Sequence, residues 1–189
     1  TIVIGCDDDP QGALFDPLEQ VEVYLLQIGE LRVPMSSFQA TVRLRNKSFL
    51  QVIVPNGGDY LESMKYGELM SVQMGHYYPS KDEFGALKTI AQAPIEQIRS
   101  DQGATRYTVT LAGYDDFTPP KPKEIALEGV QTRSVDQGVR RVRANMNIDL
   151  RPNHLAVDSD GTVFGVGQIQ YFVNSLSSGM EVLEGAVLS

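Results

Sequence analysis

The sequence contains few of the residues on which cofactor and redox chemistry depends. Its 189 residues include one cysteine, two histidines and no tryptophan. A single Cys6 excludes an intrachain disulfide framework and any CxxC metal or redox site. His76 and His154 have no second metal ligand beside them, and we expect His154 in a turn or at the surface. We therefore predict no cofactor, no metal ion and no enzymatic activity.

Long apolar runs and excess basic charge are absent as well. No segment approaches the roughly 18 apolar residues that a membrane-spanning helix needs, and the start TIVIGCDDD lacks the basic region of a secretion signal. Lysine and arginine total 16 against 24 acidic residues, a net charge of −8. This balance argues against a dedicated nucleic-acid binder, and we expect no membrane partner.

The charge that is present is unevenly distributed. The first 30 residues hold seven acids and no lysine or arginine, whereas residues 132–151 hold five arginines against two aspartates. Two interpretations stay open. Either the segments form two solvated faces of opposite charge, or an acidic segment of one copy contacts a basic strip on the next copy.

Short alternating apolar patterns run through most of the chain. VEVYLLQI (21–28) leads through a tight turn at Gly29 into a hairpin, FQATVRLRN (38–46) alternates apolar and polar residues, and FLQVIVP (49–55) follows. Further β-rich runs are 68–78, 86–93, 95–100, 105–114, 123–131, 139–149, 154–157, 163–173 and 180–187. This pattern predicts an all-β or β-dominated α+β fold, a barrel or sandwich.

The positions of glycine and proline residues indicate how the chain is divided. Residues 1–17 have scattered apolar positions and predict an N-terminal arm. The Pro-rich stretch 117–123 is a linker or a long loop between a β-barrel-like unit (18–116) and a smaller β unit (124–189). Residues 58–67 are the best candidate for a short helix, which Asp59 could cap.

Two motifs resemble binding loops only superficially. Asp158-Ser159-Asp160-Gly161 lacks the later glutamate of a calcium loop, so a β-turn is the better interpretation. Gly165 and Gly167 lie inside an apolar β pattern rather than between a strand and a helix. They predict close packing or a bulge, not a phosphate loop.

The basic strip supplies the candidate contact residues. On a strand, Arg141 and Arg143 lie on one face, whereas Arg140, Val142 and Ala144 lie on the other. The overall negative charge and the lack of interleaved aromatic residues favour contact with protein over nucleic acid. We predict a subunit contact between an acidic arm and an arginine strip, with the residues Asp7, Asp8, Asp9, Arg140, Arg141, Arg143 and Arg151.

Three stretches together resemble a known class of proteins. PMSSFQATVRLRNKSFLQVIVPNGGDYLES (34–63), TRYTVTLAGY (105–114) and the segment 140–185, with RRVRANMNIDLRP and SSGMEVLEG, occur in this order. The order resembles small tail proteins of long-tailed bacteriophages and prophages, of the baseplate hub or distal-tail class. The sequence departs from that class at Asn153-His154, where a Gly-Asp turn is expected.

The resemblance implies a structural subunit of the tail tip or baseplate, with a β-barrel of tail-tube type and a final closing sheet. It implies a homo-oligomeric ring, a trimer or hexamer, around a channel through which DNA passes without specific binding. The partners would be neighbouring copies and neighbouring tail proteins that join tube to baseplate. The location would be the virion, after assembly in the host cytoplasm.

Three alternatives stay open. The first is a ligand-binding or carbohydrate-binding β module of the tail tip, for which eight tyrosines could replace the missing tryptophan as stacking platforms. The second is a head–tail joining protein, because similar short C-terminal sheets occur in that class. The third is a small hydrolase whose site is assembled from scattered carboxylates such as Asp115, Asp116, Asp158 and Asp160.

Overall fold

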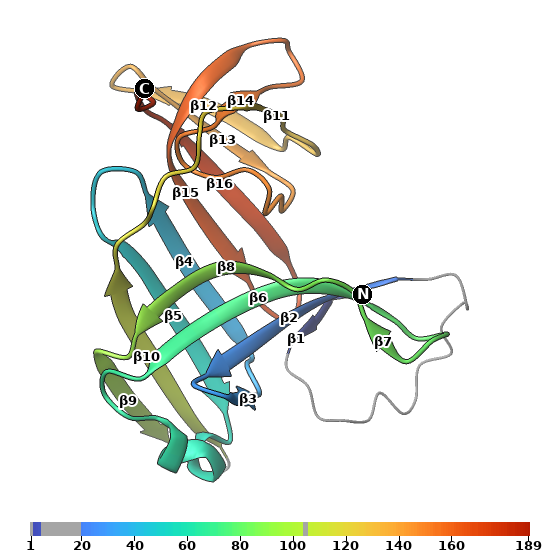
Figure 1. Cartoon of the computed structure of the whole chain (residues 1–189), viewed down its shortest axis with the longest axis vertical. Coiled ribbons are helices and arrows are strands. Elements are labelled where there is room, and N and C mark those ends of the chain that lie inside the picture. Colours follow the sequence, from blue (N-terminus) through green and yellow to red (C-terminus); the bar gives the residue numbers. More distant parts are fainter. Residues whose placement is uncertain (1, 5–19, 104–105) are drawn as a thin grey trace. The chain divides into compact units, whose positions relative to one another are not determined.

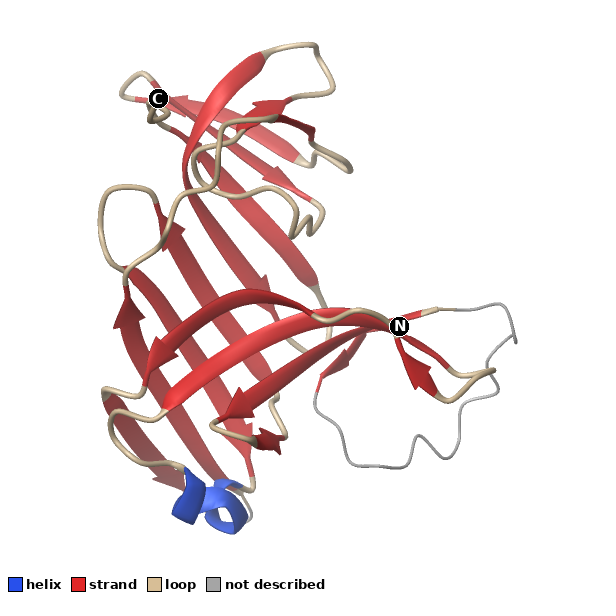
Figure 2. Cartoon of the chain, viewed as in Figure 1, coloured by secondary structure: helices blue, strands red, loops and turns tan. Residues whose placement is uncertain are grey.

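The computed structural model describes residues 2–4, 20–103 and 106–189, and strands dominate them (Figure 2). Among these residues the one helix is a short 3-10 helix, η1 (Gly57–Ser63). The all-β prediction with at most one or two short helices is therefore confirmed. The chain groups into two compact units, each built from separate stretches. Unit 1 comprises residues up to 38, 50–114 and 174–177, and unit 2 comprises 39–49, 115–173 and 178–189.

One sheet of unit 1 is built on two long strands. β2 (Val21–Ile28) and β6 (Leu69–Tyr78) pair antiparallel from Val21 opposite Tyr77 to Ile28 opposite Met70 (Figure 1). β2 turns at Gly29, whose φ of 57° favours glycine, into β3 (Leu31–Val33), so the predicted hairpin is confirmed. The sheet is completed by β1 (Ile2–Ile4), parallel to β2, and by β7 (Glu83–Phe84) and β8 (Lys88–Pro94), which pair with β6.

Apolar packing holds unit 1 together. Alternate residues of β5 (Ser48–Pro55) are buried, with Leu50, Val52 and Val54 no more than 1% exposed. From β2, Tyr24 and Leu26 are equally buried, and the Tyr24 ring lies 5.7 Å from the ring of Phe38. Each such side chain contributes about 1.5–3 kcal/mol through burial. The unit also contains the antiparallel pair β9 (Gln97–Gln102) and β10 (Tyr107–Asp115).

Unit 2 contains one part of a second, ten-stranded sheet. The order of the strands is β12 (Thr132–Asp136), β13 (Val139–Ala144), β16 (Ser178–Glu184), β15 (Val163–Val173) and β4 (Ser37–Arg43), and the sheet continues through β5 and β10 to β9. The short strands β11 (Glu124–Ala126) and β14 (Leu155–Val157) pair with each other in parallel, and β14 also pairs with β15. Val142, Ile169, Tyr171 and Val182 are completely buried between these strands and the segments that cover them.

Glycines allow β15 and the segment after β16 to approach closely. The register of β15 against β16 shifts between Val166 and Gln168, which places a β-bulge at Gly167. A Cβ on Gly167 would lie 2.9 Å from the Cα of Gly185, and a Cβ on Gly165 would lie 2.4 Å from the carbonyl oxygen of Gly185. The prediction that Gly165 and Gly167 serve close packing or a bulge is confirmed.

Some local predictions need correction or lie outside the described residues. The helical segment begins at Gly57, after Asn56 with a φ of 50°, and no side chain caps it, so the prediction of a cap at Asp59 is wrong. Of the predicted arm, residues 2–4 form β1 and the rest lies outside the described residues. No strand occupies residues 117–123. That this stretch separates two domains at the predicted boundaries stays a prediction.

Candidate assembly surface

The arginines of β13 lie on both faces of the sheet, as the alternation of side chains along a strand predicts. Val142 and Ala144 are fully buried, and Arg140 shares their face. Arg141 and Arg143 are exposed on the opposite face. The strand is held on both sides, by β12 and by β16, so the direction of each arginine is fixed by the sheet (Figure 1).

On the buried side of β13, Asp158 is the centre of an ion-pair cluster. Its side chain is 0% exposed. Arg133, on β12, donates from Nε to Oδ2 at 2.8 Å and from Nη2 to Oδ1 at 2.7 Å. Arg140 lies with Nη1 4.0 Å from Asp158 and 4.0 Å from Asp160. A bidentate pair of this kind fixes β12 to the turn that carries Asp158.

Hydrogen bonds within the cluster favour the charged forms of Asp158, Asp160 and Arg133. The hydrogen bonds from Arg133 lower the pKa of Asp158 below its usual range, and they outweigh the effect of burial. The same contact raises the pKa of Arg133. The backbone N–H of Thr162, which donates to Asp160 at 2.9 Å, lowers the pKa of Asp160. The turn itself is as predicted, because the N–H of Gly161 donates to the carbonyl of Asp158 at 2.9 Å.

Arg141 and Arg143 have weaker intramolecular partners than Arg140. Arg141 lies 3.4 Å from Glu181, with both side chains partly exposed. The guanidinium of Arg143 lies over the ring of Phe172, 4.6 Å from its centroid. Glu181 is directly opposite Arg143 in the register, yet its carboxylate pairs with Arg141. Within the described part of the chain, no carboxylate forms an ion pair with Arg143.

Arg151, the fourth arginine of the predicted strip, lies outside β13. It begins a turn in which the N–H of His154 donates to the carbonyl of Arg151 at 3.0 Å. Its side chain donates to the hydroxyl of Tyr171 at 3.4 Å and lies 5.7 Å from the centre of the Phe117 ring. The acidic members of the predicted contact, Asp7, Asp8 and Asp9, lie outside the described residues.

The same turn contains His154, as predicted, and explains the departure at Asn153-His154. His154 lies in a turn but not at the surface, since it is 3% exposed and its Nδ1 accepts the N–H of Arg151 at 3.1 Å. Burial, helped by Lys123, lowers the pKa of His154. Asn153 has a φ of 82°, a conformation that glycine prefers and asparagine tolerates. Its amide donates to the carbonyl of Pro120 at 2.7 Å and accepts the N–H of Leu188 at 2.6 Å.

Sequence reasoning missed the partners of this cluster. Arg133 and Asp158 are 25 residues apart, and only the pairing of β12 with β13 brings them together. β12 itself was not predicted, because TRSVD is polar and every residue of it is exposed. A usable signal was the turn dipeptide Gln137-Gly138, which precedes a β-rich run and predicts a hairpin.

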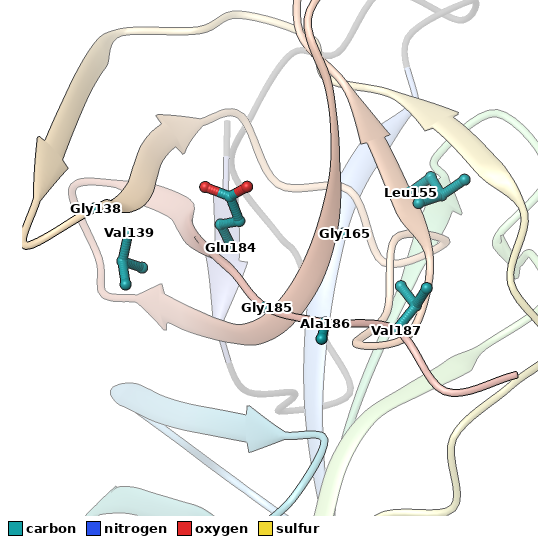
Figure 3. Close-up of a pocket in the computed structure, with 8 residues that line it drawn as sticks. All are labelled: Gly138, Val139, Leu155, Gly165, Glu184, Gly185, Ala186 and Val187. Carbon is teal, nitrogen blue, oxygen red and sulfur yellow. The ribbon is translucent and has the colours of Figure 1, made fainter.

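A hollow of about 600 Å³ lies at the end of this sheet (Figure 3). It is lined by Gly138, Val139, Leu155, Gly165, Glu184, Gly185, Ala186 and Val187. Glu184 supplies its one charged side chain, and that carboxylate accepts the backbone N–H of Arg140 at 3.1 Å. The hollow therefore has mainly aliphatic and backbone walls and no constellation suited to catalysis.

The described residues also lack two other kinds of functional element. These residues contain no group of three or more His, Cys, Asp or Glu side chains that could hold a metal ion. They also contain no helix that is long and apolar enough to cross a membrane.

Solved structures with a similar fold include two tail proteins and a component of the type VI secretion system. A tail protein from Neisseria meningitidis MC58 aligns with a TM-score of 0.58 and 6% identity over 86% of this chain and 96% of that chain. A 43 kDa tail protein of prophage MuSo2 from Shewanella oneidensis gives 0.60 and 7% over 86% and 96%. An Escherichia coli component of the type VI secretion system, described as similar to T4 bacteriophage tail proteins gp27 and gp5, gives 0.56 and 6% over 87% and 79%.

These alignments show that the chain has the fold of phage-tail-type proteins, as the sequence resemblance implied. No family model and no curated protein sequence matches the chain.

Proposed function

We propose that this chain is a structural subunit of a phage tail tip or baseplate. In this proposal it forms a homo-oligomeric ring around the DNA channel and joins the tail tube to the baseplate. The observation that carries the proposal is the fold, which matches tail-type proteins over most of the chain. The DNA would pass without specific binding, since the net charge of −8 disfavours contact with phosphate.

The subunit contact uses the exposed part of the arginine strip. Arg140 already lies beside Asp158 and Asp160, so it has little left to offer a neighbour. Arg141 and Arg143 are exposed on the other face and have room for additional acidic partners. In the proposed contact they receive Asp7, Asp8 and Asp9 of the adjacent copy.

Light scattering at several protein and salt concentrations tests the ring. We expect a trimer or hexamer whose dissociation increases with salt, because charges at the rim of an interface are screened. A strict monomer under all conditions, even together with co-expressed neighbouring tail proteins, would contradict the proposed assembly.

Charge reversal tests the contact itself. The double change Arg141→Glu and Arg143→Glu should reduce the oligomeric fraction, whereas Arg45→Glu, an exposed arginine in a loop of the same unit, should not. Replacing Asp7, Asp8 and Asp9 by asparagine should give the same loss as the double reversal. This change is cleaner than a deletion of the arm, which would also remove β1. An oligomer unaffected by either set would remove the contact from the proposal.

A further inference from the structure

β12 is a sheet edge that the described residues leave open. It pairs with β13 and with no other described strand, and all five of its residues are exposed, Val135 to 66%. It has no proline and no bulge, two of the devices that prevent another strand from pairing with an edge.

This open edge is nevertheless held in place by a buried carboxylate. Arg133, the second residue of β12, makes two hydrogen bonds to Asp158, whose side chain is 0% exposed. This ion pair adds no apolar packing to β12, because all five residues of the strand are exposed. It does reduce the conformational freedom that β12 would lose on pairing with another strand, which favours binding.

The hairpin geometry shows which backbone groups are free. Gln137 and Gly138, with φ of 50° and 81°, form a two-residue turn between Asp136 and Val139. In such a hairpin the two flanking residues bond to each other, so Asp136 and, by alternation, Ser134 point toward β13. The N–H and C=O groups of Arg133 and Val135 therefore point outward.

Unit 1 has a matching open edge. β9 pairs only with β10 among the described strands, and all but one of its six residues are exposed. The N–H of Gly103 donates to the carbonyl of Arg106 at 2.8 Å, which orients Gly103 toward β10. By alternation, Ile98, Ser100 and Gln102 present their backbone groups outward.

We propose that β12 of one copy pairs antiparallel with β9 of a second copy, with Val135 opposite Ser100. This inference rests on the proposed homo-oligomer. The register places outward backbone groups of both strands opposite each other, and it sets Arg99 against Asp136. A shift by two residues in one direction would instead place Asp101 against Asp136, which is repulsive, and the opposite shift would leave both charges without an opposite partner. Pairing of two different edges makes a head-to-tail contact, the kind that closes rings.

A proline substitution tests the edge without disturbing the hairpin. Val135→Pro removes an outward N–H and leaves the bonds to β13 intact, since proline is tolerated where the N–H faces solvent. We expect the association constant from light scattering to fall about tenfold or more, from the lost hydrogen bond and the ring's clash with the incoming strand. Val135→Thr, which keeps the N–H, is the matched control. Equal association of the proline and threonine variants, both folded by circular dichroism, would overturn the proposal.

Disulfide trapping tests the register and does not depend on the proline variant folding. In a Cys6→Ser background, Ser134→Cys and Asp101→Cys would form a non-hydrogen-bonded pair with the short Cα separation that disulfides accept. Mixing the two single variants should give a disulfide-linked heterodimer. A dimer of Ser134→Cys alone would show that β12 pairs with itself and would overturn the assignment to β9, and so would no disulfide at all.

A charge swap completes the test. Arg99→Glu and Asp136→Arg should each weaken association, and the double variant should restore it, because each interface then regains one opposite pair. Failure of the double variant to recover would contradict this register. The heterodimeric disulfide would support the strand pairing even if the protein had no role in a tail. An oligomer without that disulfide would overturn the strand pairing and leave the proposed function standing.

Discussion

The two units of this protein are stabilised by different kinds of buried groups. Five polar or charged residues are buried among the residues that the structure describes, and all five lie in unit 2: Thr41, Ser48, Asn153, His154 and Asp158. Unit 1 buries mainly aliphatic and aromatic side chains, with Tyr24, Leu26 and Met70 among the least exposed. Apolar packing tolerates many substitutions of similar volume, whereas a buried polar network requires every partner.

This difference between the units indicates at which positions a substitution should reduce stability most. Asp158 and Asn153 each connect segments that are distant in the sequence, β12 with the turn after β14, and residue 120 with residue 188. In unit 1 the equivalent connections come from strand pairing and from the buried apolar side chains of β2, β5 and β6. The folded structure of unit 2 therefore depends on a few residues more than that of unit 1 does. Its stability also depends more strongly on pH.

The largest effect should follow removal of the Asp158 carboxylate. Asp158→Ala leaves the two arginines Arg133 and Arg140 without their shared anion and should lower the free energy of unfolding by about 3 kcal/mol, measured by urea denaturation. Asp160→Asn is the control, because that side chain is 47% exposed and its replacement should lower the free energy of unfolding much less. Equal losses for the two variants would mean that burial of Asp158 is not what makes unit 2 dependent on it.

The next largest effect should come from Asn153. Asn153→Ala removes two hydrogen bonds and puts alanine, which tolerates positive φ less well than asparagine, at a φ of 82°, so we expect a loss of about 3 kcal/mol in thermal or urea unfolding. Asn153→Gly removes the same bonds but keeps the conformation unstrained, and should cost about 1–2 kcal/mol. If the glycine variant were the less stable of the two, the backbone conformation would not be the reason for asparagine here.

The stability of unit 2 should depend on pH more strongly than that of unit 1. His154 has a lowered pKa in the fold, so unfolding takes up a proton as the pH falls below the unfolded value of about 6.5, and stability decreases until the folded pKa is passed. Asp158 also has a lowered pKa, so its contribution is complete above about pH 4 and is lost as the pH falls through its folded value.

Hydrogen exchange of individual strands measures this difference. Between pH 7 and 5, amides of β16 in unit 2 should lose more protection than amides of β6 in unit 1, after correction for the intrinsic exchange rate. His154→Asn, whose side-chain amide can still accept the N–H of Arg151, should flatten the slope between pH 6.5 and 5. The comparison between units would be wrong if β6 responded to acid as strongly as β16.

The same contrast explains how much of the structure could be predicted from the sequence. Strands with alternating burial, such as β5 and β10, were predicted to within two residues, because a half-buried strand has a two-residue period that the apolar pattern repeats. β12 was missed because both of its faces are polar. Gly167 was interpreted correctly, since glycine inside an apolar β run has few other uses.

Less of the candidate surface could be predicted from the sequence. The alternation of Arg140, Arg141 and Arg143 follows directly from strand geometry. Which of them has an internal anion does not, because Asp158 and Glu181 lie far away in the sequence. Local spacing predicts the face on which a side chain lies, and only the strand order determines its partner across the sheet.

The smallest effect should be found at Arg143, whose described partner is a ring and not a carboxylate. Arg143→Ala should lower the stability of the isolated subunit by less than about 1 kcal/mol, since an exposed cation–π contact contributes about that much. Arg143→Lys should lie between the alanine variant and the unmodified protein in urea unfolding. In the oligomer, where Arg143 is proposed to contact an acidic neighbour, lysine should preserve assembly while alanine reduces it. A loss of stability at Arg143 as large as that at Asp158 would mean that the exposed face of β13 contributes as much to stability as its buried face. The distinction between Arg140, which has internal anions, and the exposed Arg143 would then be wrong.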